Sequence, residues 1–451
     1  MQNLARITQV VTPLLLSSAA FASPPRYFAT PVPGLVWPCT IFGTNAPIVG
    51  VAIAQDGRVL GHASCGSTTG GSRAYLTEPN GSVTELPHGT FTFTEPAAFL
   101  GGTKYLLIGN WCPPVNGTCT TALAIADGSA SLTVLGGSSV TSSTCEDANE
   151  AGWAVGYGGT STTSAYRLRP DATVEALDVA KGWGEYVSAV NLSGTAVGSA
   201  YISNQQRAVR WGADGVTSVL PSIEAGTSSH ARGIAYDDSI VGQCNGRAAW
   251  WFNGTPISMM PVGSASVATH MAGSPLTMDP LGFSVFGTAY NSTRFIRSNS
   301  MLNAVDIGPI DASAQAQMLE VVAAPRADYM VGLGFTPLYQ PLGFVWSLGD
   351  TVRRLDTVVV NPPATTEGYI VVAANASRQI LVNLGFNGEP YLLTELRPGD
   401  TNGDRMVDAA DLASTLAGWG AVPAGVRDAG DFDGNNVVNG ADIAVVLSNW
   451  S

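Results

Sequence analysis

Short apolar segments alternate with turn-forming residues along most of the chain, and this alternation repeats. One phrase recurs: an apolar stretch, a turn containing Asn, Asp or Gly, and then an apolar residue followed by Gly. Clear copies are DANEAGWAVGYG at 147–158 and SAVNLSGTAVGSAY at 188–201, and an eighth copy has Asn383 in place of the glycine. Self-similarity at a fixed period indicates a repeat fold. The repeated glycines, 42 to 48 residues apart, are Gly61, Gly109, Gly156, Gly198, Gly242, Gly287 and Gly332.

Each phrase is followed by two further strand-like segments, so that one repeat holds four short strands. The first of these is apolar or aromatic, as in SAYRLR at 164–169, and a turn such as Asp127-Gly128 or Asp214-Gly215 usually follows it. Four strands in about 45 residues match the size of one propeller blade. We therefore predict an all-β fold over residues 23–397, a β-propeller of eight four-stranded blades, with seven blades as the alternative.

The eighth repeat ends at Leu396 and lacks its last strand. The segment RYFATPVPGLVW at 26–37 has the character of that missing strand, because it is apolar and ends beside a turn. We predict that this N-terminal segment completes the eighth blade and closes the ring. Closure would remove the free sheet edges that otherwise invite aggregation.

Residues 398–451 differ in composition, because Asp becomes dense and helix-forming Ala and Leu appear. Two twelve-residue segments, 400–411 and 431–442, place oxygen-bearing side chains at positions 1, 3, 5, 9 and 12, as the calcium loop of an EF-hand does. The spacing predicts a helical calcium-binding domain with two calcium ions, the first bound more tightly because its loop offers four carboxylates against three. The predicted ligands, with position 7 acting through its carbonyl, are Asp400, Asn402, Asp404, Met406, Asp408, Asp411, Asp431, Asp433, Asn435, Val437, Asn439 and Asp442.

A helix-forming stretch follows each loop, DLASTLAGW at 411–419 and DIAVVLSNW at 442–450, and the two halves repeat after 31 residues. Their Leu and Trp residues fall on one helical face. With no helix before each loop and Asp at position 12, residues 398–451 resemble a type I dockerin. The resemblance implies calcium-dependent binding to a cohesin-like protein, or to another envelope or secreted protein.

Two features depart from the familiar pattern of that family. Loop position 6, a glycine in a full EF-hand, is Arg405 in the first loop and Asn436 in the second. Asn adopts the left-handed conformation more readily than Arg. Positions 10 and 11 are Ala409-Ala410 and Gly440-Ala441, where the cellulosomal version has hydroxyl residues. The second departure argues against a cellulosomal partner and leaves the calcium prediction unchanged.

The repeats themselves resemble the HAF family of extracellular repeats. The phrase A-x-N-x-x-G-x-x-V-G followed by an apolar-aromatic strand carries the resemblance, and the best match is SAVNLSGTAVGSA with AVRWGADGVTSVLP. It covers residues 26–396. The family implies an extracellular location and this architecture, and it implies no particular chemistry. The repeated Gly and Asn are expected to serve turns and packing.

The N-terminus has the pattern of a secretory signal peptide, residues 1–22. Arg6 precedes a short apolar run at 10–16, and cleavage is expected after Ala22. The run is too short to span a bilayer, and we expect no transmembrane segment. The prediction is a secreted or cell-envelope protein, in which an even number of cysteines permits disulfides. The six cysteines are Cys39, Cys65, Cys112, Cys119, Cys145 and Cys244.

The net charge of the chain limits the classes of molecule that it is expected to bind. The chain is 45% hydrophobic and 12% charged, with a net charge of −13. Such an acidic balance argues against nucleic acid, whose backbone is neutralised by clustered Lys and Arg. It is compatible with divalent cations.

No catalytic motif stands out, and His62, His88, His230 and His270 lie outside any metal or triad pattern. We therefore expect a non-catalytic protein, in which the dockerin-like module mediates calcium-dependent assembly and the propeller is a binding scaffold, with carbohydrate as one candidate ligand. Carboxylate pairs occur at 146–147 and 237–238, and a propeller channel can bring carboxylates together from different blades. The alternative is thus a dockerin-borne carbohydrate-active enzyme, an O-glycosyl hydrolase or lyase in polysaccharide catabolism. A purely structural envelope component is the third possibility.

Overall fold

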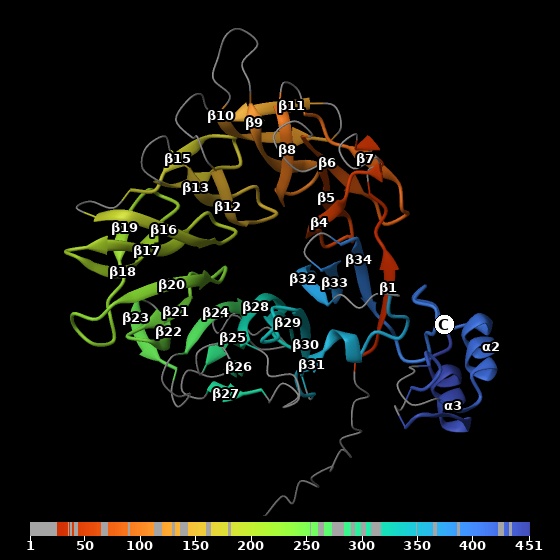
Figure 1. Ribbon diagram of the computed structural model, residues 1–451. Coiled ribbons are helices and arrows are strands. Elements are labelled where there is room, and N and C mark those ends of the chain that lie inside the picture. Colours follow the sequence, from red (N-terminus) through yellow and green to blue (C-terminus); the bar gives the residue numbers. More distant parts are fainter. Residues whose placement is uncertain are drawn as a thin grey trace, which may run out of the picture.

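The computed structural model of the chain shows a closed ring of small sheets with a helical module beside it (Figure 1). The signal-peptide prediction, and Cys65, Cys112 and Cys119, lie outside the described residues. Cys145 and Cys244 are both free thiols. The described residues are 25–34, 36, 38–39, 44–64, 71–88, 91–111, 120–128, 131–135, 143–158, 164–178, 182–252, 254–259, 266–272, 284–289, 294–298, 304–307, 317–348, 350–363, 368–385, 388–422, 428–432 and 435–451.

The ring consists, within these residues, of eight four-stranded antiparallel sheets, which confirms the predicted eight-bladed propeller. In each blade the first strand lies innermost. The strands of blades 1 to 4 are β4 (Ile48–Ile53), β5 (Val59–Ser64), β6 (Ser72–Thr77) and β7 (Val83–Glu85); β8 (Phe91–Phe99), β9 (Lys104–Trp111), β10 (Thr120–Asp127) and β11 (Ser131–Leu135); β12 (Ser143–Ala148), β13 (Ala154–Gly158), β14 (Ser164–Leu168) and β15 (Val174–Ala176); β16 (Gly182–Val190), β17 (Ala196–Ile202), β18 (Gln205–Trp211) and β19 (Thr217–Val219).

Blades 5 to 8 continue the same order, except that the outermost strand of blade 8 comes from the N-terminus. Their strands are β20 (Ser229–Ile234), β21 (Ile240–Cys244), β22 (Arg247–Phe252) and β23 (Thr255–Ser258); β24 (Val267–Ala272), β25 (Ser284–Ala289), β26 (Arg294–Ser298) and β27 (Ala304–Asp306); β28 (Gln317–Arg326), β29 (Tyr329–Phe335), β30 (Pro341–Ser347) and β31 (Arg353–Arg354); β32 (Tyr369–Ala374), β33 (Gln379–Leu384), β34 (Pro390–Glu395) and β1 (Tyr27–Pro31). The remaining elements are β2 (Pro38–Cys39), β3 (Thr44–Asn45), η1 (Leu355–Thr357), α2 (Ala409–Ala417), β35 (Gly420–Ala421), β36 (Val437–Val438) and α3 (Gly440–Ser448).

The ring closes as predicted, through β1. This strand pairs antiparallel with β34, so that Tyr27 lies opposite Glu395 and Pro31 opposite Tyr391. Its other edge is also bonded, because the amide of Tyr27 donates to the carbonyl of Val358 at 2.9 Å. The Tyr27 side chain is fully buried in the core shared by blades 7 and 8. The N-terminal strand is therefore part of the last blade.

The repeated glycine has a steric cause. Each innermost strand is shifted in register against the second strand of its blade. In six of the seven blades that carry the repeated glycine, the glycine pairs with the residue just before such a shift. In blade 2 Gly109 pairs with Thr94, two residues before Pro96, where the shift begins. Gly198, for example, pairs with Val187. A Cβ at Gly198 would overlap the carbonyl oxygen of Tyr186, and a Cβ at Gly156 would overlap that of Thr144. The backbones approach too closely there for any side chain.

The eighth blade corrects one detail of the repeat alignment. Its second strand pairs Val382 with Val371 just before the register shift, so Val382 occupies the place of the glycine. The assignment of Asn383 to that place is wrong by one residue. The Asn383 amide instead bonds both backbone groups of Gly50 in β4, accepting from the nitrogen and donating to the oxygen at 3.0 Å each. Asn383 thus links the last blade to the first.

The turn asparagines of the repeat also join neighbouring blades. The side-chain oxygen of Asn191 accepts hydrogen bonds from two backbone amides of its own turn, and its Nδ2 donates to the backbone carbonyl of Ala235 in the next blade at 3.1 Å. Asn149 donates in the same way to the carbonyl of Asn191 at 2.8 Å, and Asn375 to that of Ala54 at 2.9 Å. Each of these side chains fixes a turn and a blade-to-blade contact at once.

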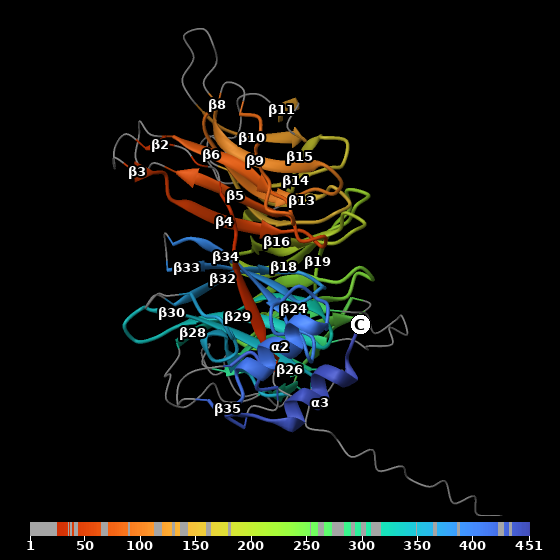
Figure 2. The ribbon, with the colours of Figure 1, turned by 90° about the vertical axis from the view of Figure 1, so that its right-hand side faces the viewer.

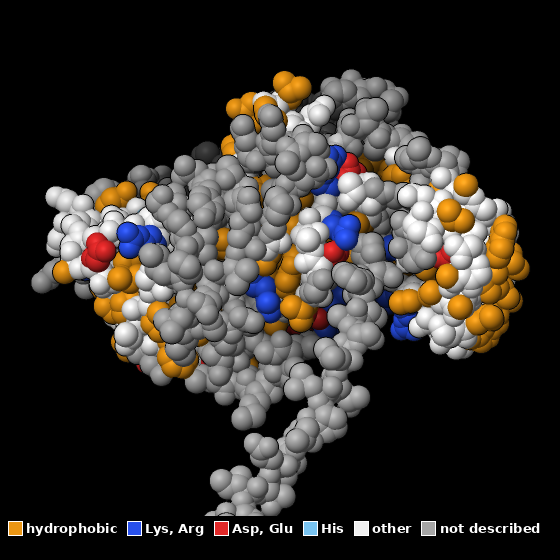
Figure 3. Space-filling view, turned by 90° about the horizontal axis from the view of Figure 1, so that it is seen from below, with side chains coloured by type: hydrophobic (Ala, Val, Ile, Leu, Met, Phe, Trp, Pro, Cys, Tyr) orange, Lys and Arg blue, Asp and Glu red, His pale blue; other side chains and the backbone are white. Residues whose placement is uncertain are grey.

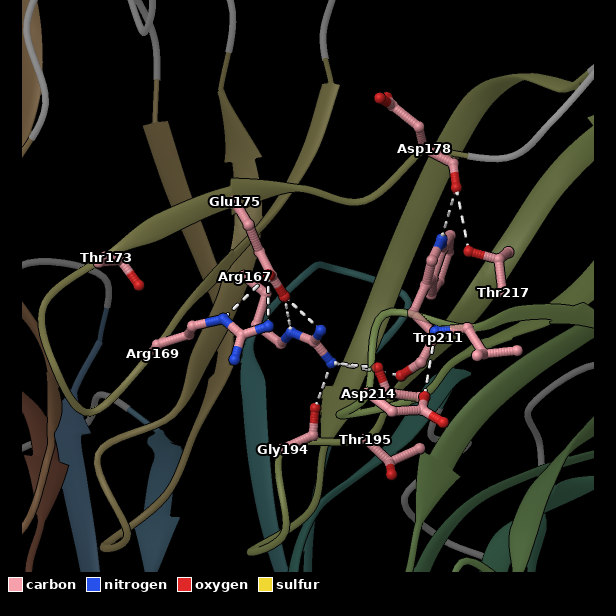
Figure 4. A network of polar contacts seen from close by, with 12 residues as sticks. Arg167, Arg169, Thr173, Glu175, Asp178, Gly194, Thr195, Trp211, Asp214 and Thr217 are labelled. Atoms are coloured by element: carbon pink, nitrogen blue, oxygen red, sulfur yellow. Dashed lines mark hydrogen bonds and ion pairs between the residues drawn. The ribbon is translucent and has the colours of Figure 1, made fainter.

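A buried arginine adds a further link between blades 3 and 4 (Figure 4). Arg167 in β14 is about 1% exposed, and it pairs with Glu175 in its own blade. Its Nη1 donates to the carbonyl of Gly194, in the first turn of blade 4, at 2.5 Å. One repeat later, Arg210 in the same place of β18 reaches Asp238 in the first turn of blade 5. Both contacts involve charged groups, but only the Arg167 contact is buried, which strengthens it; Arg210 and Asp238 are 30% and 39% exposed.

Between the blades the core is apolar. Leu60 and Leu76 of blade 1 pack with Tyr105 and Leu107 of blade 2, and the other blades pack in the same way. No helix within the described part of the chain has the length and the apolar character needed to cross a membrane.

Replacing the repeated glycine in one blade should destabilise the ring. We expect Gly198→Ala to lower the free energy of unfolding by about 2 kcal/mol or more, because the new Cβ forces two backbones apart. Denaturant unfolding of the ring measures the change. Gly440→Ala is the control, since a Cβ there meets no atom within 4 Å. An equal effect of the two substitutions would contradict the steric explanation.

Candidate functional site

The C-terminal module lies against the outer side of the ring, next to β1 (Figures 1 and 2). Helices α2 and α3 follow the two predicted loops, and β35 pairs with β36 between them. A small core of Val407, Phe432 and Val446 holds the two halves together. Each helix begins with a capping box, at Asp408 and at Asn439. Asp411 and Asp442, the last residues of the two loops, complete these capping boxes and so fix the start of each helix.

In the first loop the side-chain oxygens hold the backbone in a tight curve. Asp400 accepts hydrogen bonds from the amides of Asn402, Gly403 and Arg405 at 2.7 to 3.2 Å. Asp404 accepts from the amide of Met406 at 2.8 Å. The loop thereby turns its own amides toward its acidic side chains.

Position 12 of the first loop is fully buried. Asp411 accepts from the amide of Thr401 at 2.7 Å with one oxygen, and from that of Asp408 at 2.9 Å with the other. Burial would raise the pKa of Asp411, but these hydrogen bonds outweigh it and lower the pKa. At Asp400 burial prevails over the amide hydrogen bonds, and its pKa is raised.

The second loop repeats this arrangement where it is described. Asp431 accepts from the amides of Asn435 and Asn436 at 3.2 and 2.9 Å, and the buried Asp442 accepts from those of Phe432 and Asn439 at 2.7 and 2.9 Å. Asn435 accepts from the amide of Val437. Asp433, the predicted ligand at position 3, lies outside the described residues.

The loop backbone fits a bound cation at the position where the sequence departs from an EF-hand. Arg405 and Asn436, both at position 6, have φ values of 70° and 63°, the left-handed conformation that glycine ordinarily supplies. Among the described residues, however, no three His, Cys, Asp or Glu side chains converge closely enough to hold a metal ion. The curvature of the loops and their oxygen donors suit a hard cation such as calcium.

The module exposes an apolar surface on the side away from the ring. Figure 3 shows hydrophobic side chains along the outer edge of the right-hand lobe. Leu416 and Trp419 in the first half are 50% and 57% exposed, and Leu447 and Trp450 in the second half are 56% and 48% exposed. We call these four residues the paired apolar face. These exposed apolar side chains make this surface the module's candidate for contact with another molecule.

Residues around β1 connect the module to the ring. Arg26 donates to the backbone carbonyls of Asp428 and Ala429, and its guanidinium lies 4.8 Å from the centre of the Phe432 ring. Burial lowers the pKa of Arg26 to about 10, although nearby aspartates, Asp431 foremost, oppose the shift, so Arg26 stays charged at neutral pH. Its Nη1 is buried without a hydrogen-bond partner among the described residues.

A second candidate site lies on the axis of the ring. A cavity of about 990 Å³ is lined by the innermost strands of blades 3 to 8. Glu146, Asp147 and Glu320 bring carboxylates to its wall, and Arg232 brings a guanidinium. Burial raises the pKa of Asp147 to about 6, against the hydrogen bond that its carboxylate accepts from Val190. The sequence marked 146–147 only as one of two carboxylate pairs, and it contained no signal for Arg232 or Glu320.

The other residues that the sequence singled out lie apart from this cavity. Asp237 and Asp238 are in the first turn of blade 5, and Asp238 pairs with Arg210. His62 is on β5, where burial lowers its pKa to about 4. Asp238 is thus engaged in an ion pair and His62 belongs to a strand, and neither contributes to the cavity lining.

No family model and no curated protein matches the chain. Among solved structures, streptogramin B lyase aligns over 82% of this chain and 98% of its own, with 10% identity and a TM-score of 0.40. The acylaminoacyl peptidase of Pyrococcus horikoshii aligns over 77% of this chain and 60% of its own, with 10% identity and a TM-score of 0.42. A putative TolB from Agrobacterium tumefaciens covers 62% and 88%, with 11% identity and a TM-score of 0.30. Likeness at this level carries no argument about function.

Loss of the Arg26 guanidinium should loosen the module from the ring. We expect Arg26→Met to weaken docking by about 1–3 kcal/mol, because hydrogen bonds from a charged donor are lost. Limited proteolysis at residues 396–399 would then become faster, with little change in the thermal unfolding of the ring. Arg354→Met is the control, since Arg354 pairs only with Asp356 on the ring. Equal cleavage rates of Arg26→Met and the unaltered protein would contradict this role.

Proposed function

We propose that this is a secreted calcium-binding protein whose C-terminal module mediates calcium-dependent assembly with another protein, while the propeller acts as a binding scaffold. The observation that carries the proposal is the duplicated loop. In both copies position 6 is left-handed and position 12 is a buried aspartate that bonds the backbone at positions 2 and 9. Two segments with oxygen-bearing side chains at the same five positions, and a left-handed residue at position 6 of each, favour a common ligand for their oxygens.

Calcium would supply positive charge that balances the carboxylates of the two loops. In the first loop Asp400, Asn402, Asp404, Asp408 and Asp411 would hold it, with the Met406 carbonyl. In the second, the corresponding donors run from position 431 to position 442. Without a cation the clustered carboxylates repel one another, and such modules commonly fold only with metal. The resemblance of residues 398–451 to a type I dockerin supports the same reading.

The paired apolar face is the surface proposed for assembly. It combines equivalent residues from both halves, so it presents nearly the same apolar pair twice. A partner of the cohesin type, or another secreted or envelope protein, would cover it. Because loop positions 10 and 11 are Ala409-Ala410 and Gly440-Ala441, without hydroxyl groups, we expect apolar contacts to contribute more to this interface than hydrogen bonds do.

Calcium binding should be stoichiometric and should stabilise the module. We expect two calcium ions per chain in equilibrium dialysis, and one when Asp400→Ala removes position 1 of the first loop. Chelation should reduce the helical circular-dichroism signal and make the module susceptible to protease. Asp214→Asn, on a turn of the propeller, is the control and should leave both ions bound. An unchanged ion count in Asp400→Ala would rule out the first loop as a site.

Capture of a partner should depend on calcium and on the paired apolar face. The full-length chain serves as bait for the envelope and secreted proteins of the source cell, with calcium and with a chelator. We expect capture only with calcium, and loss of capture when Trp419→Ser and Trp450→Ser are combined.

The matched control changes exposed apolar residues on the ring. Leu338→Ser with Tyr339→Ser removes side chains that are 82% and 70% exposed and lie far from the module in sequence, and capture should persist. A partner that is retained regardless of calcium, or that binds the double Trp variant equally well, would contradict the proposal.

A further inference from the structure

Besides further shifts nearer the ends of β8, β16 and β28, each innermost strand contains one register shift that inserts a single residue between two paired positions. A β-bulge of this kind re-aims a side chain relative to the strand around it, and bulges recur beside functional sites. The inserted residues can be read from the pairing of each innermost strand with its neighbour. In order around the ring they are Val51, Ala97, Glu146, Ser188, Arg232, Thr269, Val322 and Val372.

These eight residues divide the ring into two arcs. Blades 3 to 6 contribute polar residues in unbroken succession, and blades 7, 8, 1 and 2 contribute apolar ones. Glu146, Ser188, Arg232, Thr269 and Val322 all line the axial cavity. The apolar wall of that cavity, from blades 7 and 8, is completed by Leu319, Val321, Leu333 and Val371. In a ring of eight, blade 3 faces blade 7, so the polar arc and the apolar wall lie on opposite sides of the cavity (Figure 1).

The polar arc carries two opposite charges that do not pair with each other. Arg232 has no hydrogen bond or ion pair within the described part of the chain, and its side chain is exposed to the cavity. Within the described residues the Glu146 carboxylate accepts one hydrogen bond, from the hydroxyl of Thr144 at 3.1 Å. Both charged side chains line the cavity together with Tyr157. The Tyr157 hydroxyl donates a hydrogen bond to the backbone carbonyl of Val187 at 2.5 Å. An unpaired cation and an unpaired anion thus face one space.

We propose that the axial cavity binds a short peptide with free ends, its carboxylate at Arg232, its ammonium at Glu146 and its apolar side chains against the wall of blades 7 and 8. Ser188 supplies a hydroxyl beside the charged pair, for the peptide backbone. Glu320, on the apolar side, would meet a second positive charge, so peptides with a basic side chain are preferred. The volume of about 990 Å³ is in the range of pockets that enclose small ligands.

The alternatives match the lining less well. A neutral oligosaccharide offers hydroxyl groups but leaves both charges without a counterpart. A simple anion satisfies Arg232 and is repelled by Glu146 and Glu320. A zwitterion with an apolar body matches the guanidinium, the carboxylate and the wall together.

The test uses the full-length chain with calcium present. A library of tripeptides with free ends is equilibrated with the protein by dialysis, and the retained members are identified by mass spectrometry. The best of them is then measured by calorimetry as the free acid and as the C-terminal amide. We expect the amide to bind the unaltered protein about tenfold more weakly. Arg232→Met should weaken binding of the free acid about tenfold and leave binding of the amide unchanged. Glu146→Gln should weaken binding of the peptide with a free ammonium about tenfold and leave binding of the N-acetylated peptide unchanged.

Arg207→Met is the matched control, since Arg207 lies on β18, outside the residues that line the cavity. Arg232→Lys keeps the positive charge and should restore part of the affinity. A lost charge can thereby be distinguished from a folding defect. Retention of no tripeptide at millimolar concentration would overturn the proposal. Equal affinity of Arg232→Met and Arg207→Met for the free acid would do so too. Binding of the uncharged probe maltotetraose, unaffected by Arg232→Met, would assign the cavity to sugars instead.

This inference rests on the scaffold part of the proposed function, and it is independent of the calcium part. A chelator should leave peptide binding within about twofold of its value with calcium, because the cavity lining comes entirely from the ring. Failure of the calcium loops would show in the ion count, and failure of the cavity would show in the peptide titration. The two outcomes are therefore separable.

Discussion

The pairing of β1 with β34 is the contact on which the rest of the structure depends. A propeller blade cannot bury both faces alone, so each depends on its neighbours, and an open ring would leave two blades half-covered. Tyr27 and Ala29 of β1 are part of the core between blades 7 and 8. The same segment also receives the C-terminal module, through Arg26 on one side and Phe28 against Gly403 on the other. Ring closure and the position of the module thus share a few consecutive residues.

Side-chain links between blades explain why the repeat keeps residues that a strand alone would not require. The turn asparagine fixes its own turn and donates to the next blade, as Asn191 does to Ala235. The third-strand arginine reaches the next blade's first turn, as Arg167 does at Gly194. Removing one partner of such a buried, charge-assisted contact would leave the other unsatisfied, which costs more than the contact itself contributes. The blades are therefore joined by specific polar contacts as well as by apolar packing.

The sequence was sufficient for the ring and for its closure, because the spacing of the glycines and the missing last strand are both visible in it. It was insufficient where the pairing register of two strands determines which residue occupies a given position. Asn383 was aligned with the repeated glycines because it follows an apolar residue, yet pairing places Val382 there. The left-handed conformation of Arg405 was likewise unexpected for that residue type; the Asp400 carboxylate, which accepts its amide, holds it. Both depend on contacts between residues that no local pattern encodes.

The axial cavity was missed for the same reason. A period-two pattern tells which residues face a core, but a bulge adds one residue and breaks the period where a side chain turns to the axis. Arg232 therefore looked like an ordinary strand residue between Ala231 and Gly233. The cavity is lined by residues of the ring, and the paired apolar face belongs to the module, which lies beside the ring (Figure 1). The two proposed binding surfaces therefore share no residue, and a substitution in one leaves the lining residues of the other unchanged.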